Sequence, residues 1–263
     1  MKRIKKIFLS TLLFCFSYSA MAWGLTGHRV IGAIAESYLT AKAKMAVSAI
    51  LGNESIAMSA NWADFIKSDS TFNYLSPWHY FNIDQGKTKS EFMNLLRQDT
   101  ATDAYTKINF LIKELKNKQL PGDKKLMYLR LLIHIVGDIH EPLHVGQFDD
   151  LGGNRVKVTW FGEASNLHSV WDEKLIESQK LSYTEYSNAI NYTASKQRRE
   201  WQKQPLSEWL FESYQIAGQL YNGITQPDQR LSYRYNFENL EILNQRLLKA
   251  GVRLAGILNQ IFA

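Results

Sequence analysis

Apolar side chains recur with a helical period along most of the chain. In the segment that begins at His28 they recur every three or four positions as far as Leu51, and Gly52 and Asn53 favour a helix end there. The same period predicts further helices near residues 56–67, 90–118 (broken near Thr100), 122–140, 165–178, 205–223 and 236–262. The fold class is therefore expected to be mainly α.

Strand character is confined to two short segments, Trp78–Ile83 and Arg155–Trp160. In the second segment, apolar and polar side chains alternate, which predicts a short hairpin-like β element. No repeat, low-complexity tract or linker divides the chain. Residues 23–263 are therefore expected to form a single domain.

Residues 1–22 have the pattern of a secretory signal peptide. Basic residues precede the apolar run Ile7 to Phe16, and Ala20-Met21-Ala22 supplies the small residues of a cleavage site. That run is about half of the roughly 20 residues that a membrane-spanning helix needs, so a transmembrane anchor is the less favoured alternative. We expect cleavage after Ala22 and an exported protein that begins at Trp23.

Loss of the signal would change the charge of the protein. The whole chain carries 31 basic and 25 acidic residues, a net charge of +6, and removing the four basic residues of the signal leaves 27 against 25, a net charge of +2. This small charge excludes the broad basic surface typical of duplex-binding proteins. The only cysteine, Cys15, lies in the signal, and an exported protein without cysteine is typical of the bacterial periplasm or medium.

Most histidines of the chain lie close to a carboxylate. His134 and Asp138 are one helical turn apart, and so are His168 and Asp172, so that each pair can reach one ion from one helix face. Pro142 is expected to end the first of these helices and to bring His144 near Asp138.

These pairs favour a metal site. A single histidine on an apolar face is usually a hydrogen-bonded core residue, but two pairs with apolar neighbours would bury unpaired charge unless a cation satisfied it. Imidazole and carboxylate without thiolate are typical of catalytic Zn²⁺ with water in an open position.

The motifs, in this order, resemble those of the S1/P1 nucleases. They are Trp23, Gly27-His28, Trp62-Ala63-Asp64, Trp78-His79-Tyr80, His134, Gly137-Asp138-Ile139-His140-Glu141-Pro142-Leu143-His144, Gly152-Gly153-Asn154 and Asn166-Leu167-His168-Ser169-Val170-Trp171-Asp172. Beyond Asp172 only the helical pattern continues. The resemblance implies a helical zinc enzyme, built like phospholipase C and P1 nuclease, that cleaves single-stranded DNA and RNA to 5′-phosphate products, with 3′-nucleotidase activity as a further expectation.

The resemblance also implies the ligands of three zinc ions. The first ion is assigned to Asp64, His79, His134 and Asp138, the second to His144, His168 and Asp172, and the third to Trp23, His28 and the bridging Asp138. Trp23 would bind through its α-amino nitrogen and its carbonyl oxygen, so signal cleavage would create that ligand.

Further residues are implied in catalysis and substrate binding. A hydroxide held between ions that Asp64 and Asp138 bind would attack phosphorus, and Lys67 would stabilise the developing charge, unless it is a solvated surface lysine. Tyr80 matches an aromatic residue of the family that stacks on a base. Asn154 matches an asparagine that contacts substrate, and the alternative is that it belongs to an ordinary turn.

The roles of Asn82 and His140 do not follow from the motifs. Asn82 stands where fungal members have aspartate, which leaves the base preference open. His140 is expected to support a ligand from outside the metal set or to lie in the core.

Two alternative functions remain open. Zinc-dependent phospholipase C has the same architecture and an N-terminal Trp, but it uses Glu where this chain has Asp172, and it has a longer gap than the four residues between Trp23 and His28. The chain could instead be a zinc carrier or a non-catalytic nucleic-acid-binding protein. A carrier would more often have one exposed His-rich tract, whereas the candidate ligands here are distributed over five segments that a folded core must bring together. We expect a monomer without a membrane anchor.

Overall fold

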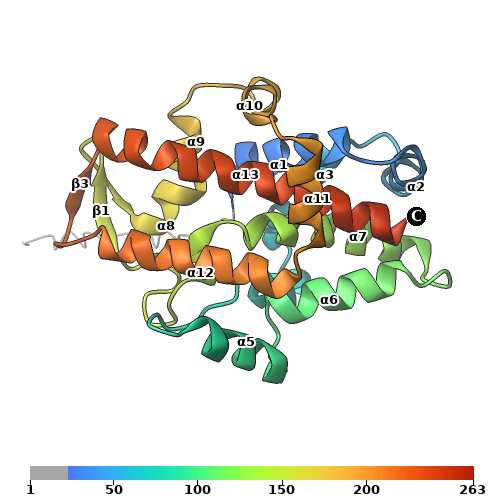
Figure 1. The fold of residues 1–263 in the computed structure, drawn as a ribbon, viewed down its shortest axis with the longest axis horizontal. Coiled ribbons are helices and arrows are strands. Elements are labelled where there is room, and N and C mark those ends of the chain that lie inside the picture. Colours follow the sequence, from blue (N-terminus) through green and yellow to red (C-terminus); the bar gives the residue numbers. More distant parts are fainter. Residues whose placement is uncertain (1–22) are drawn as a thin grey trace, which may run out of the picture.

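The structure, a computed structural model, describes residues 23–263, and helices dominate it (Figure 1). The expected signal segment, residues 1–22, lies outside the described residues. The α-helices are α1 (Leu25–Ser37), α2 (Ala41–Leu51), α3 (Ile56–Ser59), α4 (Trp62–Phe65), α5 (Lys89–Gln98), α6 (Ala104–Leu115), α7 (Gly122–Asp138), α8 (Leu167–Ser169), α9 (Leu175–Glu177), α10 (Tyr183–Ile190), α11 (Ser195–Lys203), α12 (Leu206–Asn222) and α13 (Tyr233–Ile261). The mainly α fold is confirmed.

Several further helical segments are tighter or wider than an α-helix. The 3₁₀ segments are η1 (Ile66–Ser68), η2 (Ser70–His79) and η3 (Pro142–Val145), and η4 (Val170–Lys174) is a π-helical turn between α8 and α9. Within residues 23–263, no helix combines the length and the apolarity that crossing a membrane requires.

Helix α13 extends along the molecule with α1 packed on it (Figure 1). Ion pairs from Glu212 connect α12 to α13. The approach of α1 is so close that a Cβ atom at Gly251 would lie 2.6 Å from the Cβ of Ile34. A side chain at this position would therefore force the two helices apart. This contact holds α1 against the core.

The first predicted helix is wrong at its centre, because the chain turns at residues 38–40 between α1 and α2. Thr40 has an extended backbone, and its hydroxyl accepts the N–H of Ala43 at 3.2 Å, which makes it the N-cap of a new helix. Its own N–H donates to the side chain of Asn259 on α13 at 2.8 Å. The predicted end at Gly52 is confirmed, where φ is +67°.

The predicted strand at Trp78–Ile83 is also wrong. Trp78 and His79 end η2, and the extended residues that follow join no sheet. The N–H groups of Phe81 and Ile83 instead donate to the carbonyls of His144 and Gly146, at 2.8 and 2.7 Å. The alternating apolar residues thus enter the core beside η3 without a partner strand.

A small sheet forms around β1 (Lys157–Trp160), within the predicted strand. β2 (Glu163–Asn166) pairs with it antiparallel and β3 (Gln229–Leu231) parallel. Phe161 and Gly162 connect β1 to β2 with φ of 49° and 91°, which suits a two-residue hairpin turn. β2 occupies the predicted start of the helix near 165–178, which begins at Leu167 instead.

A buried charged group joins α12 to α13. Glu212 of α12 lies 2.9 Å from Arg246 Nη1 and 2.8 Å from Arg253 Nη1, and both arginine side chains are at most 2% exposed. Burial alone raises the pKa of Glu212, but Arg253, with Arg246 and Lys249, outweighs it and holds the pKa at about 2.

The same group fixes the end of α7. Arg246 Nε donates to the carbonyl of His140 at 2.9 Å, and the Ser213 hydroxyl donates to the carbonyl of Ile139. These two carbonyls directly follow Asp138, the last residue of α7. Ser213 of α12 and Arg246 of α13 therefore hold the turn that follows Asp138.

Glu212→Gln tests this group, because it leaves two buried guanidinium groups without a counter-charge. We expect a loss of about 3 kcal/mol at pH 7, the lower end for a broken buried pair, because the Glu212 side chain keeps 22% exposure. Since the pKa is lowered, its contribution is present above the unfolded pKa and lost as pH falls towards about 2. Urea unfolding at neutral pH and near pH 3 should show the difference shrinking.

The matched control is Glu238→Gln, which breaks the exposed ion pair of Glu238 with Arg234 on α13. This change should have little effect on the free energy of unfolding, because water and salt screen an exposed pair. Equal losses in the two variants at neutral pH would contradict the role of Glu212.

Candidate metal centre

The structure brings the residues predicted as ligands together from distant segments. Each is at most 8% exposed. They are Trp23 before α1, His28 on α1, Asp64 on α4, His79 at the end of η2, His134 and Asp138 on α7, His144 on η3, His168 on α8 and Asp172 on η4.

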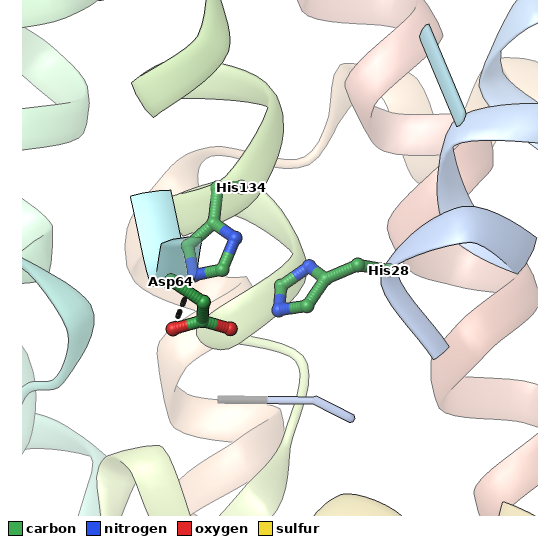
Figure 2. A group of neighbouring side chains, drawn as sticks. All are labelled: His28, Asp64 and His134. Carbon is green, nitrogen blue, oxygen red and sulfur yellow. Dashed lines mark ion pairs between the residues drawn. The ribbon is translucent and has the colours of Figure 1, made fainter. Parts of the chain in front are cut away.

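One cluster joins α1, α4 and α7. His28, Asp64 and His134 point towards one another (Figure 2), and their ligand atoms lie within 4.8 Å of each other. The rings of His28 and His134 stack at 3.9 Å between centroids, and His134 Nε2 lies 3.7 Å from Asp64 Oδ1. Three separate elements thus present metal-ligating atoms to one point.

Asp138 lies at the centre of the histidines. Its Oδ1 is 3.2 Å from His28 Nε2, and its Oδ2 is 2.9 Å from His79 Nδ1 and 3.3 Å from His134 Nε2. Burial, and then the charge of Asp64, raise the pKa of Asp138 well above its usual range. A fully buried carboxylate with imidazoles on both oxygens has the geometry of a bridging ligand.

A further cluster contains His144, His168 and Asp172. The Nε2 atoms of the two histidines lie 3.6 and 2.8 Å from the carboxylate of Asp172. Burial lowers the pKa of His168, but the charge of Asp172 outweighs this and raises it to about 9. The negative potential here favours any cation, a proton or a metal ion.

Backbone carbonyls set the orientation of three imidazoles. In His134, His144 and His168 the Nδ1 atom lies at hydrogen-bond distance from a main-chain oxygen, which assigns the ring hydrogen to Nδ1 and leaves the Nε2 lone pair to the cluster. The acceptors are the carbonyls of Ala60, His79 and Gly152, at 2.6, 2.6 and 2.7 Å.

Many of these atoms have no hydrogen-bond partner within residues 23–263. The buried atoms without one include Nε2 of His28, His79, His144 and His168, Asp64 Oδ2, Asp138 Oδ1 and Asp172 Oδ1. Such burial is costly unless a cation satisfies the atoms. Imidazole and carboxylate without thiolate fit Zn²⁺.

Trp23 lies beside both clusters. Its buried indole N–H donates to the carbonyl of Gly137 at 2.8 Å, and the N–H of Gly24 donates to the carbonyl of Asp172 at 2.7 Å. The main chain at Trp23 is thus held between the end of α7 and η4.

The residues predicted to contact substrate differ in their surroundings. Lys67 Nζ lies 2.6 Å from Asp64 Oδ1, and its side chain is 29% exposed, so it is tied to a predicted ligand. Tyr80 directly follows His79 and is 38% exposed. Asn154 donates to the carbonyl of Leu151 at 2.9 Å, a contact within an ordinary turn, and its role towards substrate stays a prediction.

The paired glycines before Asn154 have a visible structural role. Gly152 and Gly153 have φ of 63° and 82°, and a Cβ atom on Gly152 would collide with the carbonyl of Leu143. The carbonyl of Gly152 accepts from His168 Nδ1. The glycine turn therefore orients His168.

His140 lies in the core rather than at the metal clusters. Its Nδ1 donates to the carbonyl of Val136 at 2.7 Å, and its Nε2 accepts from Arg253 at 3.0 Å. Burial, then Arg246 and Arg253, lower its pKa well below the usual value, so the ring is neutral.

Glu141 is a buried acid that the sequence did not indicate as a metal ligand or a catalytic residue. A carboxylate oxygen of Glu141 and ring nitrogens of His144 and His168 lie within 4.8 Å of one another. The sequence feature that points to Glu141 is its position in the short segment between two predicted ligands, Asp138 and His144.

Comparison with known proteins identifies similar chains. The S1/P1 nuclease family model matches residues 23–263. Endonuclease 3 of Arabidopsis thaliana is 30% identical over 265 residues, covering 93% of this chain and 90% of that protein. Nuclease S1 of Aspergillus oryzae is 27% identical over 292 residues, covering 99% and 98%. Nuclease P1 of Penicillium citrinum is 28% identical over 171 residues, covering 62% and 63%.

The clusters predict that zinc stabilises the fold. Adding Zn²⁺ to chelator-treated protein should raise Tm by several degrees, because an ion that binds the assembled clusters binds the folded state. Mg²⁺, which prefers oxygen ligands, should have little effect. Elemental analysis of the zinc-loaded protein should return about three ions per chain. One ion or none, or an equal response to Mg²⁺, would contradict the assignment.

Proposed function

The chain belongs to the S1/P1 nuclease family, and we propose that it hydrolyses phosphodiester bonds of single-stranded DNA and RNA at a trinuclear zinc centre, releasing 5′-phosphate products. The family predicted from the motifs is confirmed. The observation that carries the proposal is Asp138, a buried carboxylate contacted by His28, His79 and His134.

The zinc ligands are proposed as the sequence grouped them. Asp64, His79, His134 and Asp138 hold one ion, His144, His168 and Asp172 a second, and Trp23, His28 and Asp138 a third. The unpartnered buried atoms of these side chains support the assignment. When bound, zinc supplies a water of lowered pKa and positive charge for the phosphate.

The chain's own side chains complete the site. Lys67 neutralises Asp64 on one side and adds positive charge for a phosphate oxygen. Tyr80 offers a partly exposed ring on which an unstacked base can lie, next to the ligand His79. A base inside a duplex is already stacked, so this arrangement favours single strands.

Export belongs to the proposal, since the α-amino group of Trp23 becomes free only when the segment before it is removed. The contacts of Trp23 and Gly24 with Gly137 and Asp172 support this position for the mature N-terminus. We place the enzyme in the periplasm or the medium of a bacterium, with a 3′-nucleotidase activity at the same centre.

The test compares three substrates with the processed, zinc-loaded protein. Single-stranded DNA should be cleaved much faster than matched duplex, because Tyr80 needs an unstacked base and a net charge of +2 gives little attraction to a duplex backbone. Products should carry 5′-phosphates, and phosphatidylcholine vesicles should stay intact. Hydrolysis of the lipid without cleavage of DNA would assign the chain to phospholipase C chemistry instead.

Asp138→Asn should lower turnover far more than Lys67→Ala. Asp138 is proposed to bridge two ions, so its loss disturbs both of them. Lys67 is proposed only to stabilise the developing charge, so Lys67→Ala should lower kcat by about 10²–10³. Both variants are assayed on single-stranded DNA after zinc saturation, with zinc content measured in parallel. Equal losses at equal zinc content would contradict these roles.

The N-terminus gives a separate prediction. In protein that begins Met-Trp23, the nitrogen of Trp23 is an amide without an available lone pair, so zinc content and activity should both fall. Trp23→Phe with a correctly processed terminus is the control, because its amine and carbonyl remain and only the indole contact to Gly137 is lost. Full activity of the extended protein, with the extension verified by mass spectrometry, would show that the N-terminus is not a ligand.

A further inference from the structure

Glu141 is a fully buried acid on the turn that joins α7 to η3. Its Oε2 accepts the backbone N–H of His144 at 2.9 Å, which caps η3 and fixes the carboxylate in place. Its Oε1 is buried and has no hydrogen-bond partner within residues 23–263. A carboxylate oxygen in this state needs a proton or a cation.

The surroundings of Glu141 favour a metal cation. A carboxylate oxygen of Glu141 and ring nitrogens of His144 and His168 lie within 4.8 Å of one another. Asp172 approaches the Nε2 atoms of the same histidines at 3.6 and 2.8 Å. Two carboxylates, Glu141 and Asp172, therefore lie close to the same two imidazoles, whose Nδ1 atoms are committed to backbone carbonyls.

The donor set matches tetrahedral zinc. Bonds of 2.0–2.2 Å to nitrogen and oxygen place tetrahedral ligand atoms about 3.3 Å apart. Asp172 already lies 3.6 and 2.8 Å from the two Nε2 atoms, and an oxygen of Glu141 lies within 4.8 Å of a ring nitrogen of each histidine. Two carboxylates would also balance the charge of one divalent ion.

We propose that Glu141 is a fourth protein ligand of the ion held by His144, His168 and Asp172, an inference that rests on the proposed function. Glu141 then has two tasks, because one oxygen caps η3 and positions His144 while the other binds the metal. The same ion would accept a substrate oxygen by expanding to five ligands.

Glu141→Gln is the central test, because the amide keeps an acceptor for the His144 N–H and removes the charge. Zinc-loaded proteins are equilibrated with increasing chelator, and retained zinc is measured by elemental analysis. One of the three ions should be lost at a chelator strength about 10-fold or more below that of the wild type, with the other two retained as in the wild type. The absorption spectrum of cobalt-substituted protein should change as well.

Asp103→Asn is the matched control. Asp103 is likewise a buried N-cap carboxylate, accepting the N–H of Thr106 at 2.9 Å, and it lies outside the metal clusters. This variant should keep wild-type zinc retention. If Glu141→Gln also keeps it, with an unchanged cobalt spectrum, Glu141 is a cap only and the inference fails while the proposed function stands.

A second measurement needs no variant. In a crystal structure of the zinc-loaded wild type, an oxygen of Glu141 should lie about 2.0–2.2 Å from the ion between His144 and His168. An ion there without Glu141 in its coordination would overturn the inference alone. No zinc in the wild type would overturn the proposed function and the inference together.

Discussion

The burial of Asp138 is the constraint on which the remaining structure depends. A carboxylate with no exposure, beside the further carboxylate of Asp64, is stable only where positive charge or strong hydrogen-bond donors surround it. The fold meets that need with imidazoles from α1, η2 and α7. Each imidazole lies on a different element. The site therefore forms only when these elements pack together.

On the side away from the metal clusters, the end of α7 is held by a positively charged side chain and a hydroxyl group. Arg246 and Ser213 bind the two carbonyls that follow Asp138, and Glu212 balances the arginine. The turn after Asp138 therefore lies between the guanidinium group of Arg246 in the core and the carboxylates of the metal clusters. This fixes the direction in which Glu141 and His144 leave the helix, so a displacement of α12 or α13 would reach both metal clusters.

The sequence predicted the long helices, and which His and Asp residues lie close together, better than it predicted the short elements. α7, α12 and α13 have an apolar stripe long enough to identify from periodicity, and the His–Asp pairs lie within one helical turn, a local geometry. α11 has a mostly charged sequence that packs through Trp201 alone among its buried residues, so no stripe marked it. β2 and β3 are three or four residues long and exist only through pairing with β1. The direction of the Glu141 side chain likewise depends on the turn at Pro142, which no spacing rule describes.

The balance of charge at the centre explains how a nearly neutral protein can act on a polyanion. Asp64, Asp138, Asp172 and Glu141 place four carboxylates in or beside the clusters, and three divalent ions would exceed them by two positive charges, with Lys67 adding one more. The excess is local, because residues 23–263 as a whole carry only 27 basic against 25 acidic residues, a net charge of +2. Attraction of this kind is strong for a phosphate that reaches the centre and weak for a distant duplex surface. Selection of a flexible strand would therefore follow from where the charge lies, and the proposed stacking of a base on Tyr80 would reinforce it.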